Sequence, residues 1–122
     1  MGSQPEYIYH IVTPEEWGKA CQSGTYTAPS LQAEGFIHFS YLDQVLATAE
    51  RYYSDIPDLL VLKVDIGKLT AAMKVEQATH GGWYPHLYGE LNLSAVIGYH
   101  PLKRSAGGSL ELHEIETWDH LC

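Results

Sequence analysis

The chain has 122 residues, of which 45% are hydrophobic and 18% are charged, and its formal net charge is −8. This length and composition are typical of one globular domain with a buried core, and they exclude general disorder. The acidic charge argues against extended contact with nucleic acid or acidic membranes, because phosphate neutralisation drives such binding.

The first elements along the chain are a strand and a helix. Tyr7–Val12 is rich in β-branched and aromatic residues and predicts a strand that ends near His10. Thr13 then has the pattern of a helix N-cap, with Glu16 three residues later as its capping-box partner. This helix is expected to run to about Gln22.

A second strand and a second helix follow in the N-terminal half. A short helical turn is expected after Ser30, and Phe36–Phe39 predicts a strand. Ser40 can cap a helix at Leu42–Tyr53, where apolar residues recur on one face.

The second half of the chain is rich in predicted strands. Leu59–Asp65 is almost continuously apolar and predicts a central strand, and Met73–Gln77 predicts another. Leu93–Tyr99 predicts a strand that ends before Pro101, and Leu110–Ile115 predicts an edge strand. The fold class is therefore α+β, with two helices in the N-terminal half.

We expect a single domain over residues 1–122, with a compact core at about 7–103 and a C-terminal extension at 104–122. No apolar run approaches the roughly 20 residues of a membrane span, and the N-terminus lacks the pattern of a secretory signal. Cys21 and Cys122 have no disulfide framework around them and are expected to be free thiols. A cytoplasmic location without membrane contact is predicted from these features.

Two histidines lie in predicted strands beside hydroxyl residues. Strand alternation places His38 and Ser40 on the same face, and we interpret them as candidate site residues. His10 ends its strand directly before a helix cap, and two interpretations stay open: a ligand-orienting histidine or a core histidine bonded to backbone carbonyls.

A third cluster spans Trp83 to Glu90 and contains His86 and Tyr88. Flat aromatic rings beside polar groups suit a pocket for a ring-shaped ligand, although a proline-stiffened loop packed on the core is the alternative. Glu76 and Glu90 are the candidate carboxylates, and Glu76 ranks ahead because a strand holds a side chain more firmly than a loop does. A zinc or iron site on the histidines is a weaker hypothesis, because no close-spaced ligand motif is present.

Two combinations of residues resemble a known bacterial family. These are Gly35–Ser40, with the sequence Gly-Phe-Ile-His-Phe-Ser, and Pro85–Gly89, with the sequence Pro-His-Leu-Tyr-Gly. Together with Trp17 and Gly24 they resemble the family called domain of unknown function 952, over roughly residues 7–103. The family name states no activity.

The N-terminal half is also similar, more distantly, to the NAD-dependent RNA 2′-phosphotransferases. His10 matches the histidine of their His-Gly-Thr motif, and His38 matches the second histidine of their later His-x-His strand. Trp17 and Gly24 match a tryptophan and a glycine that lie between these motifs. The resemblance implies the ADP-ribosyltransferase fold, which has a split β-core that holds NAD in a cleft.

This second resemblance implies NAD as the cofactor, a small nucleotide as the ligand, and transfer of ADP-ribose to an unknown acceptor. It implies catalytic roles for His10, His38 and a late glutamate, at Glu76 or Glu90. Its cofactor-binding residues would be six side chains with polar or aromatic groups: His10, Thr13, Ser40, Trp83, His86 and Tyr88.

The chain also departs from that pattern. Ile11 and Val12 replace the glycine of the His-Gly-Thr motif, and the arginines that hold the RNA phosphate have no clear match. Removal of an RNA phosphate is therefore not expected. A catalytically inactive regulator that binds a nucleotide or a protein, and a histidine-based metalloenzyme, stay open as alternatives.

Overall fold

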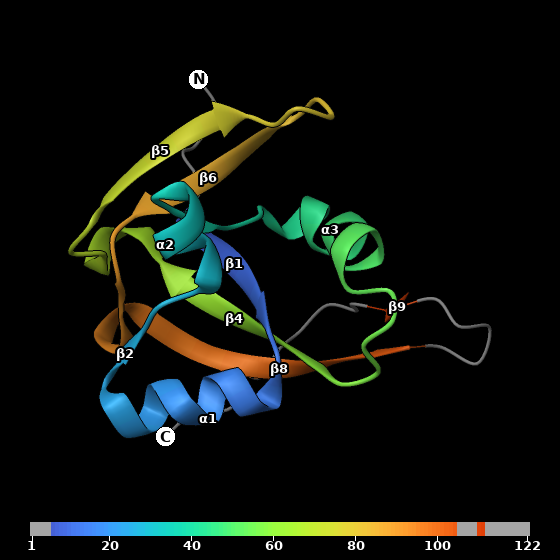
Figure 1. Cartoon of the computed structure of the whole chain (residues 1–122), viewed down its shortest axis with the longest axis horizontal. Helices are drawn as coiled ribbons and strands as arrows, with labels where there is room; N and C mark the ends of the chain where they lie inside the picture. The colour runs from blue at the N-terminus through green and yellow to red at the C-terminus, as the bar shows by residue number, and fades with distance from the viewer. Residues whose placement is uncertain (1–5, 105–109, 112–122) are drawn as a thin grey trace.

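The computed structural model describes residues 6–104 and 110–111, which form an α+β fold of antiparallel sheets and short helices (Figure 1). The strands are β1 Tyr7–Val12, β2 Thr25–Tyr26, β3 Ile37–His38, β4 Leu59–Asp65, β5 Ala72–Gln77, β6 Trp83–Tyr88, β7 Leu91–Asn92, β8 Val96–Arg104 and β9 Leu110–Glu111. The helices are α1 Pro14–Ser23, α2 Pro29–Glu34 and α3 Val45–Tyr52, and the 3₁₀ turns are η1 Leu42–Gln44, η2 Ile66–Lys68 and η3 Leu93–Ala95.

The largest sheet has the strand order β1-β4-β8-β9, and its two faces are both covered. On β1, Ile8 and Val12 share one face with Trp17 of α1 in a single apolar cluster. Ile11 packs on the opposite face with Val45 of α3. Because both faces are buried, β4 is almost continuously apolar instead of alternating.

Helix α1 begins where the sequence predicts. The Thr13 hydroxyl accepts a hydrogen bond from the Glu16 backbone N–H at 3.1 Å, and the Glu16 carboxylate accepts one from the Thr13 N–H at 3.0 Å. Gly24 ends the helix with φ of 90°, a left-handed conformation that glycine adopts without steric cost. The predicted capping box is therefore confirmed.

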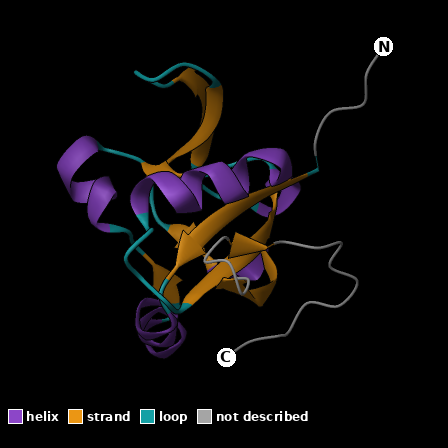
Figure 2. Ribbon diagram, turned by 90° about the vertical axis from the view of Figure 1, so that its right-hand side faces the viewer, coloured by secondary structure: helices purple, strands orange, loops and turns teal. Residues whose placement is uncertain are grey.

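A second sheet of three strands has the order β3-β6-β5, and one bridge joins it to the large sheet. The backbone groups of Tyr9 and Ser40 exchange two hydrogen bonds of 2.8 Å. Beyond this bridge the sheets part, and Figures 1 and 2 show the β5–β6 hairpin projecting away from the large sheet. The two larger antiparallel sheets thus share a single short contact, and β2 and β7 form a separate two-stranded sheet in the described residues.

Several predicted elements are wrong in detail. The N-terminal half has three α-helices in the described residues and not two, because Pro29–Glu34 forms a full helix. The helix expected at Leu42–Tyr53 begins as a 3₁₀ turn and becomes α-helical only at Val45. Ser40 does not cap it, since the Gln44 side chain accepts a hydrogen bond from the Tyr41 N–H instead.

The second half differs in two places. The aromatic cluster at Trp83–Tyr88 is strand β6, so the interpretation as a loop is wrong. Strand β8 continues through Pro101 to Arg104 and does not stop before the proline. Of the predicted edge strand at Leu110–Ile115, only Leu110–Glu111 lies in the described residues, and it is β9.

Cys21 of α1 packs half-buried against the core and is not a free thiol, so that expectation is wrong for this residue. Cys122 lies outside the described residues. None of the helices in the described part of the chain has the length and apolar character that a membrane crossing requires. The cytoplasmic location stays a prediction, and it no longer has support from a free Cys21.

Candidate functional site

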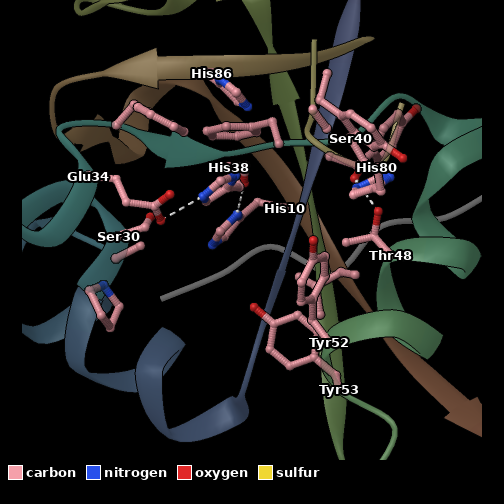
Figure 3. Close-up of a pocket in the computed structure, with 18 of the residues that line it drawn as sticks. His10, Ser30, Glu34, His38, Ser40, Thr48, Tyr52, Tyr53, His80 and His86 are labelled. Carbon is pink, nitrogen blue, oxygen red and sulfur yellow. Dashed lines mark hydrogen bonds and ion pairs between the residues drawn. The ribbon is translucent and has the colours of Figure 1, made fainter. Parts of the chain in front are cut away.

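A pocket of about 670 Å³ lies where the two sheets part. Figure 3 shows residues from both sheets and from α2 and α3 gathered around it. Of the residues predicted from the sequence, the pocket brings together His10, His38, Ser40 and His86. Its other polar and aromatic lining residues are Tyr9, Glu16, Tyr26, Ser30, Glu34, Phe36, Phe39, Thr48, Tyr52, Tyr53, Gln77, Thr79, His80 and Tyr84.

His10 is buried at the back of this pocket, and both of its ring nitrogens have partners. Nδ1 donates a 2.6 Å hydrogen bond to the His38 carbonyl oxygen, which fixes the proton on that nitrogen. Nε2 is then an acceptor and receives the Tyr26 hydroxyl at 2.8 Å. Burial lowers the pKa of His10 from 6.5 to about 4, against an opposing effect of the bond to His38. The ring is therefore neutral at pH 7.

Tyr26 is the residue that holds the other side of His10. Burial raises the pKa of its phenol, and the nearby Glu16 carboxylate adds to this effect. The phenol therefore keeps its proton and donates it to His10. Of the two interpretations of His10, the structure combines features of both: it is a core histidine bonded to a carbonyl, and it also lines the pocket.

His38 has an exposed side chain at the mouth of the pocket. Its Nε2 lies 2.9 Å from Glu34 Oε2, one helical turn earlier in the chain. Gly35 makes this contact possible, because its φ of 91° ends α2 and turns the chain into β3. Figure 3 shows the pair side by side above His10.

His86 lies opposite His38 in the register of β3 and β6, and their ring centroids are 5.2 Å apart. The Glu76 carboxylate of β5 lies 2.9 Å from His86 Nδ1 and also accepts the Tyr88 hydroxyl. Since the carboxylate accepts, neutral His86 holds its proton on Nδ1 and presents Nε2 as an acceptor. The hydrogen bond from Tyr88 is the largest cause that lowers the pKa of Glu76, followed by that from His86.

The ring of Phe36 contacts both His38 and His86. Its ring stacks on His86 with a centroid distance of 4.1 Å and an interplanar angle of 19°. It also meets His38 edge-on at 4.8 Å. Phe36 thereby packs both histidines into one aromatic surface on the pocket wall.

The remaining predicted residues have other positions. Ser40 is buried and its hydroxyl lies 3.1 Å from the Thr48 hydroxyl on α3. Thr13 caps α1 and does not line the pocket. Trp83 and Glu90 are exposed and also lie outside the lining.

Sequence reasoning missed Tyr26, Glu34 and Phe36. Glu34 lies four residues before His38, a spacing typical of helix pairs, but Gly35 intervenes and hides that signal. Phe36 shares the alternation face of His38 and could have been found from that pattern. Tyr26 has no local signal, because its contact with His10 spans 16 residues.

The histidines do not form a metal site in this arrangement. Within residues 6–104 and 110–111, no group of three or more His, Cys, Asp or Glu side chains has the geometry to hold a metal ion. Glu34 and Glu76 each pair with a different histidine.

Comparison with known proteins identifies the family. Residues 11–99 match the model of a family described as protein of unknown function, DUF952. The chain belongs to this family. The expected family membership is therefore confirmed, while no curated protein matches the chain.

Solved structures also resemble this DUF952 member. The crystal structure of protein CC0527 from Caulobacter crescentus has a TM-score of 0.77 and 31% sequence identity, covering 86% of this chain and 93% of that chain. The solution NMR structure of CC0527 has a TM-score of 0.73 and 32% identity, covering 84% and 90%. These similarities support the fold and the family and name no activity.

Proposed function

We propose that the pocket binds an NAD-type dinucleotide and that the protein transfers ADP-ribose from it to an acceptor. The observation that supports this most is the convergence of His10, His38, Ser40 and His86 on one pocket of about 670 Å³. That volume lies in the usual range for small-molecule sites. Two sheets that part at a single bridge also agree with the split β-core implied by the distant resemblance.

The charge of the pocket suits the nicotinamide half of such a ligand. Its lining includes Glu16 and Glu34 but no Lys or Arg among the described residues. A positively charged nicotinamide ring is favoured by these carboxylates and by the aromatic faces of Phe36 and Tyr84.

The roles of the residues follow from their bonds. In the transfer, the bond between ribose C1′ and nicotinamide breaks, and its electron pair leaves with neutral nicotinamide. The acceptor forms the new bond to C1′ and gives its proton to His86 Nε2, which the Glu76 contact to Nδ1 leaves available. Glu34 is the lining carboxylate beside His38, where it stabilises positive charge that develops on the ribose.

Two predicted roles change in this proposal. His10 has no free ring nitrogen, so it acts as a positioning residue that fixes Tyr26 and the His38 carbonyl. Glu76 acts through His86 and not on the ribose directly. A catalytic role for Glu90 stays a prediction from the sequence, since its side chain is outside the lining.

Ligand-observed NMR with NAD, followed by assay of nicotinamide in the same samples, tests the proposal. Wild type should bind NAD and release nicotinamide, and His38→Ala should weaken binding at least tenfold. Glu76→Gln should bind NAD normally and lower turnover. Gln22→Ala is the control, because Gln22 is exposed on α1 and outside the pocket. Absence of binding at millimolar NAD would refute the proposal.

A regulator without turnover is the second candidate. The observation in its favour is that both nitrogens of His10 are already engaged within the protein. NAD binding without nicotinamide release, in wild type and with diverse acceptors, would support the regulator and contradict the transferase.

A further inference from the structure

Strand β5 is the edge of the three-stranded sheet. It pairs with β6 on one side, and its other side has no partner strand within the described residues. Figures 1 and 2 show the β5–β6 hairpin extending from the body of the molecule. Val75 is 43% exposed and Trp83, near the tip of the same hairpin, is 56% exposed. An open edge with exposed apolar residues is a template for pairing with another strand.

The register of the hairpin determines which backbone groups face outward. The Ala78 N–H donates to the Gly82 carbonyl, which makes these two residues a hydrogen-bonded pair of the antiparallel ladder. Such pairs alternate along a ladder, so Glu76, Lys74 and Ala72 direct their backbone groups toward β6. The N–H and C=O groups of Met73, Val75 and Gln77 therefore point to the open side.

Only some registers allow a second β5 strand to use these groups. Outward residues must lie opposite outward residues, so an antiparallel pair can be centred on Lys74, Val75 or Glu76. A centre at Lys74 places two lysines opposite each other, and a centre at Glu76 does the same with two glutamates. A centre at Val75 places Lys74 opposite the partner's Glu76, and Glu76 opposite the partner's Lys74.

We propose that β5 pairs with β5 of a second copy of this chain, antiparallel and centred on Val75, to form a two-fold symmetric dimer. Three residue pairs then exchange two backbone hydrogen bonds each: Val75 with its counterpart, and Met73 with the partner's Gln77 in both directions. Two Lys–Glu pairs lie across the two-fold axis, and opposite charges at such positions stabilise a sheet. The short sequence Lys74-Val75-Glu76 is thus self-complementary in charge only in this register.

The dimer also reaches the candidate site. Lys74 and Glu76 share the face of the sheet that carries His86, their neighbour on β6. The partner's Lys74 would therefore stand next to the carboxylate that holds His86. This pairing does not depend on the proposed enzymatic activity, because it rests on the backbone and charges of β5 alone.

Sedimentation velocity of the full chain over a concentration series tests the assembly. With rising concentration, wild type should shift from the 13.6 kDa monomer to a species of twice that mass. No larger species should form, because the two-fold pairing occupies the open β5 edge of both copies. Val75→Lys should weaken the dimer by tenfold or more, because it places two like charges at the centre. Leu42→Lys is the matched control, as Leu42 is 52% exposed on η1, away from β5. A wild type that stays monomeric at several hundred micromolar, or that forms larger assemblies, would overturn the proposal.

Charge reversal tests the register itself. Lys74→Glu and Glu76→Lys should each be monomeric alone, because like charges then face each other at two positions. An equimolar mixture of the two variants should recover the dimer, and so should the double variant. Circular dichroism verifies that each variant is folded. Failure of both the mixture and the double variant to dimerise, or a dimer in Lys74→Glu alone as strong as in wild type, contradicts the Val75-centred pairing.

Discussion

The buried imidazole of His10 should make the stability of the fold depend on pH. Its pKa is about 4 in the folded protein and about 6.5 in an unfolded chain. The unfolded state therefore binds a proton more readily, and stability falls as pH drops from 6.5 toward 4. Between pH 8 and pH 5, His10 alone should reduce the free energy of unfolding by about 2 kcal/mol, a large share of a typical 5–15 kcal/mol.

The assay compares wild type with His10→Asn by urea denaturation at pH 8, 7, 6 and 5. Asparagine can keep a donor toward the His38 carbonyl but has no proton to gain in this range. The variant should be less stable at pH 8, because the Tyr26 hydroxyl loses its buried acceptor. Its loss of stability on acidification should be smaller than that of wild type by about 2 kcal/mol.

The difference between the two pH profiles isolates His10 from the other titrating groups, which both proteins share. Equal losses between pH 8 and pH 5 would refute the reasoning, since they would mean that His10 binds a proton equally well in both states. An NMR titration of the His10 ring is a second measurement, and its chemical shifts should not change above pH 5.

Two further predictions concern the β5–β6 hairpin and Gly89, which follows β6. Gly89→Ala should destabilise the fold by about 1–3 kcal/mol in urea denaturation, because a Cβ at this position would lie 2.7 Å from the Ala71 Cβ; an unchanged midpoint would contradict that contact. In Glu76→Gln the Tyr88 phenol should ionise at lower pH than in wild type, since its hydrogen bond to the carboxylate is the main cause that raises its pKa. Carbon-13 NMR of the tyrosine rings measures this, and an unshifted Tyr88 titration would contradict the bond.

The elements that could be predicted from the sequence are those with strong local signals. β1, α1 and β4 follow from apolar patterns, a capping box and a C-terminal glycine, and the structure confirms all three. The predicted start of α3 is wrong, because the Gln44 side chain holds Leu42–Gln44 in a 3₁₀ turn before the α-helix begins. Such a choice between two kinds of helix depends on one side-chain bond and not on periodicity.

Strand β6 was missed because Pro85 lies inside it. A proline cannot donate to a sheet ladder and normally indicates an edge or a loop. Here the Pro85 carbonyl accepts a hydrogen bond from the Phe39 N–H on the β3 side. At the next residue, Ser40, the chain leaves β6 and bonds to Tyr9 of β1 instead. The N–H that Pro85 lacks would therefore belong to the last residue pair between the β3 segment and β6, and the strand loses only one hydrogen bond.

The same departure at Ser40 explains why the site was only partly predictable. Strand alternation placed His38 and Ser40 on one face, but no local pattern shows that Ser40 bonds to Tyr9 and so draws His10 under His38. Tyr26 and His86 also reach the pocket through contacts between residues far apart in the sequence. A family motif can therefore identify the histidines, while only the joined sheets show that they line one pocket.

The three histidines of the pocket differ in how many of their ring nitrogens are hydrogen-bonded within the protein. In His10, Nδ1 is hydrogen-bonded to the His38 carbonyl and Nε2 to the Tyr26 hydroxyl. This ring therefore stabilises the wall of the pocket and has no nitrogen left for a ligand. In His86 only Nδ1 is paired, with Glu76, and in His38 only Nε2 is paired, with Glu34. The proposed chemistry therefore rests on His38 and His86, whose rings contact each other across β3 and β6 and both pack against Phe36.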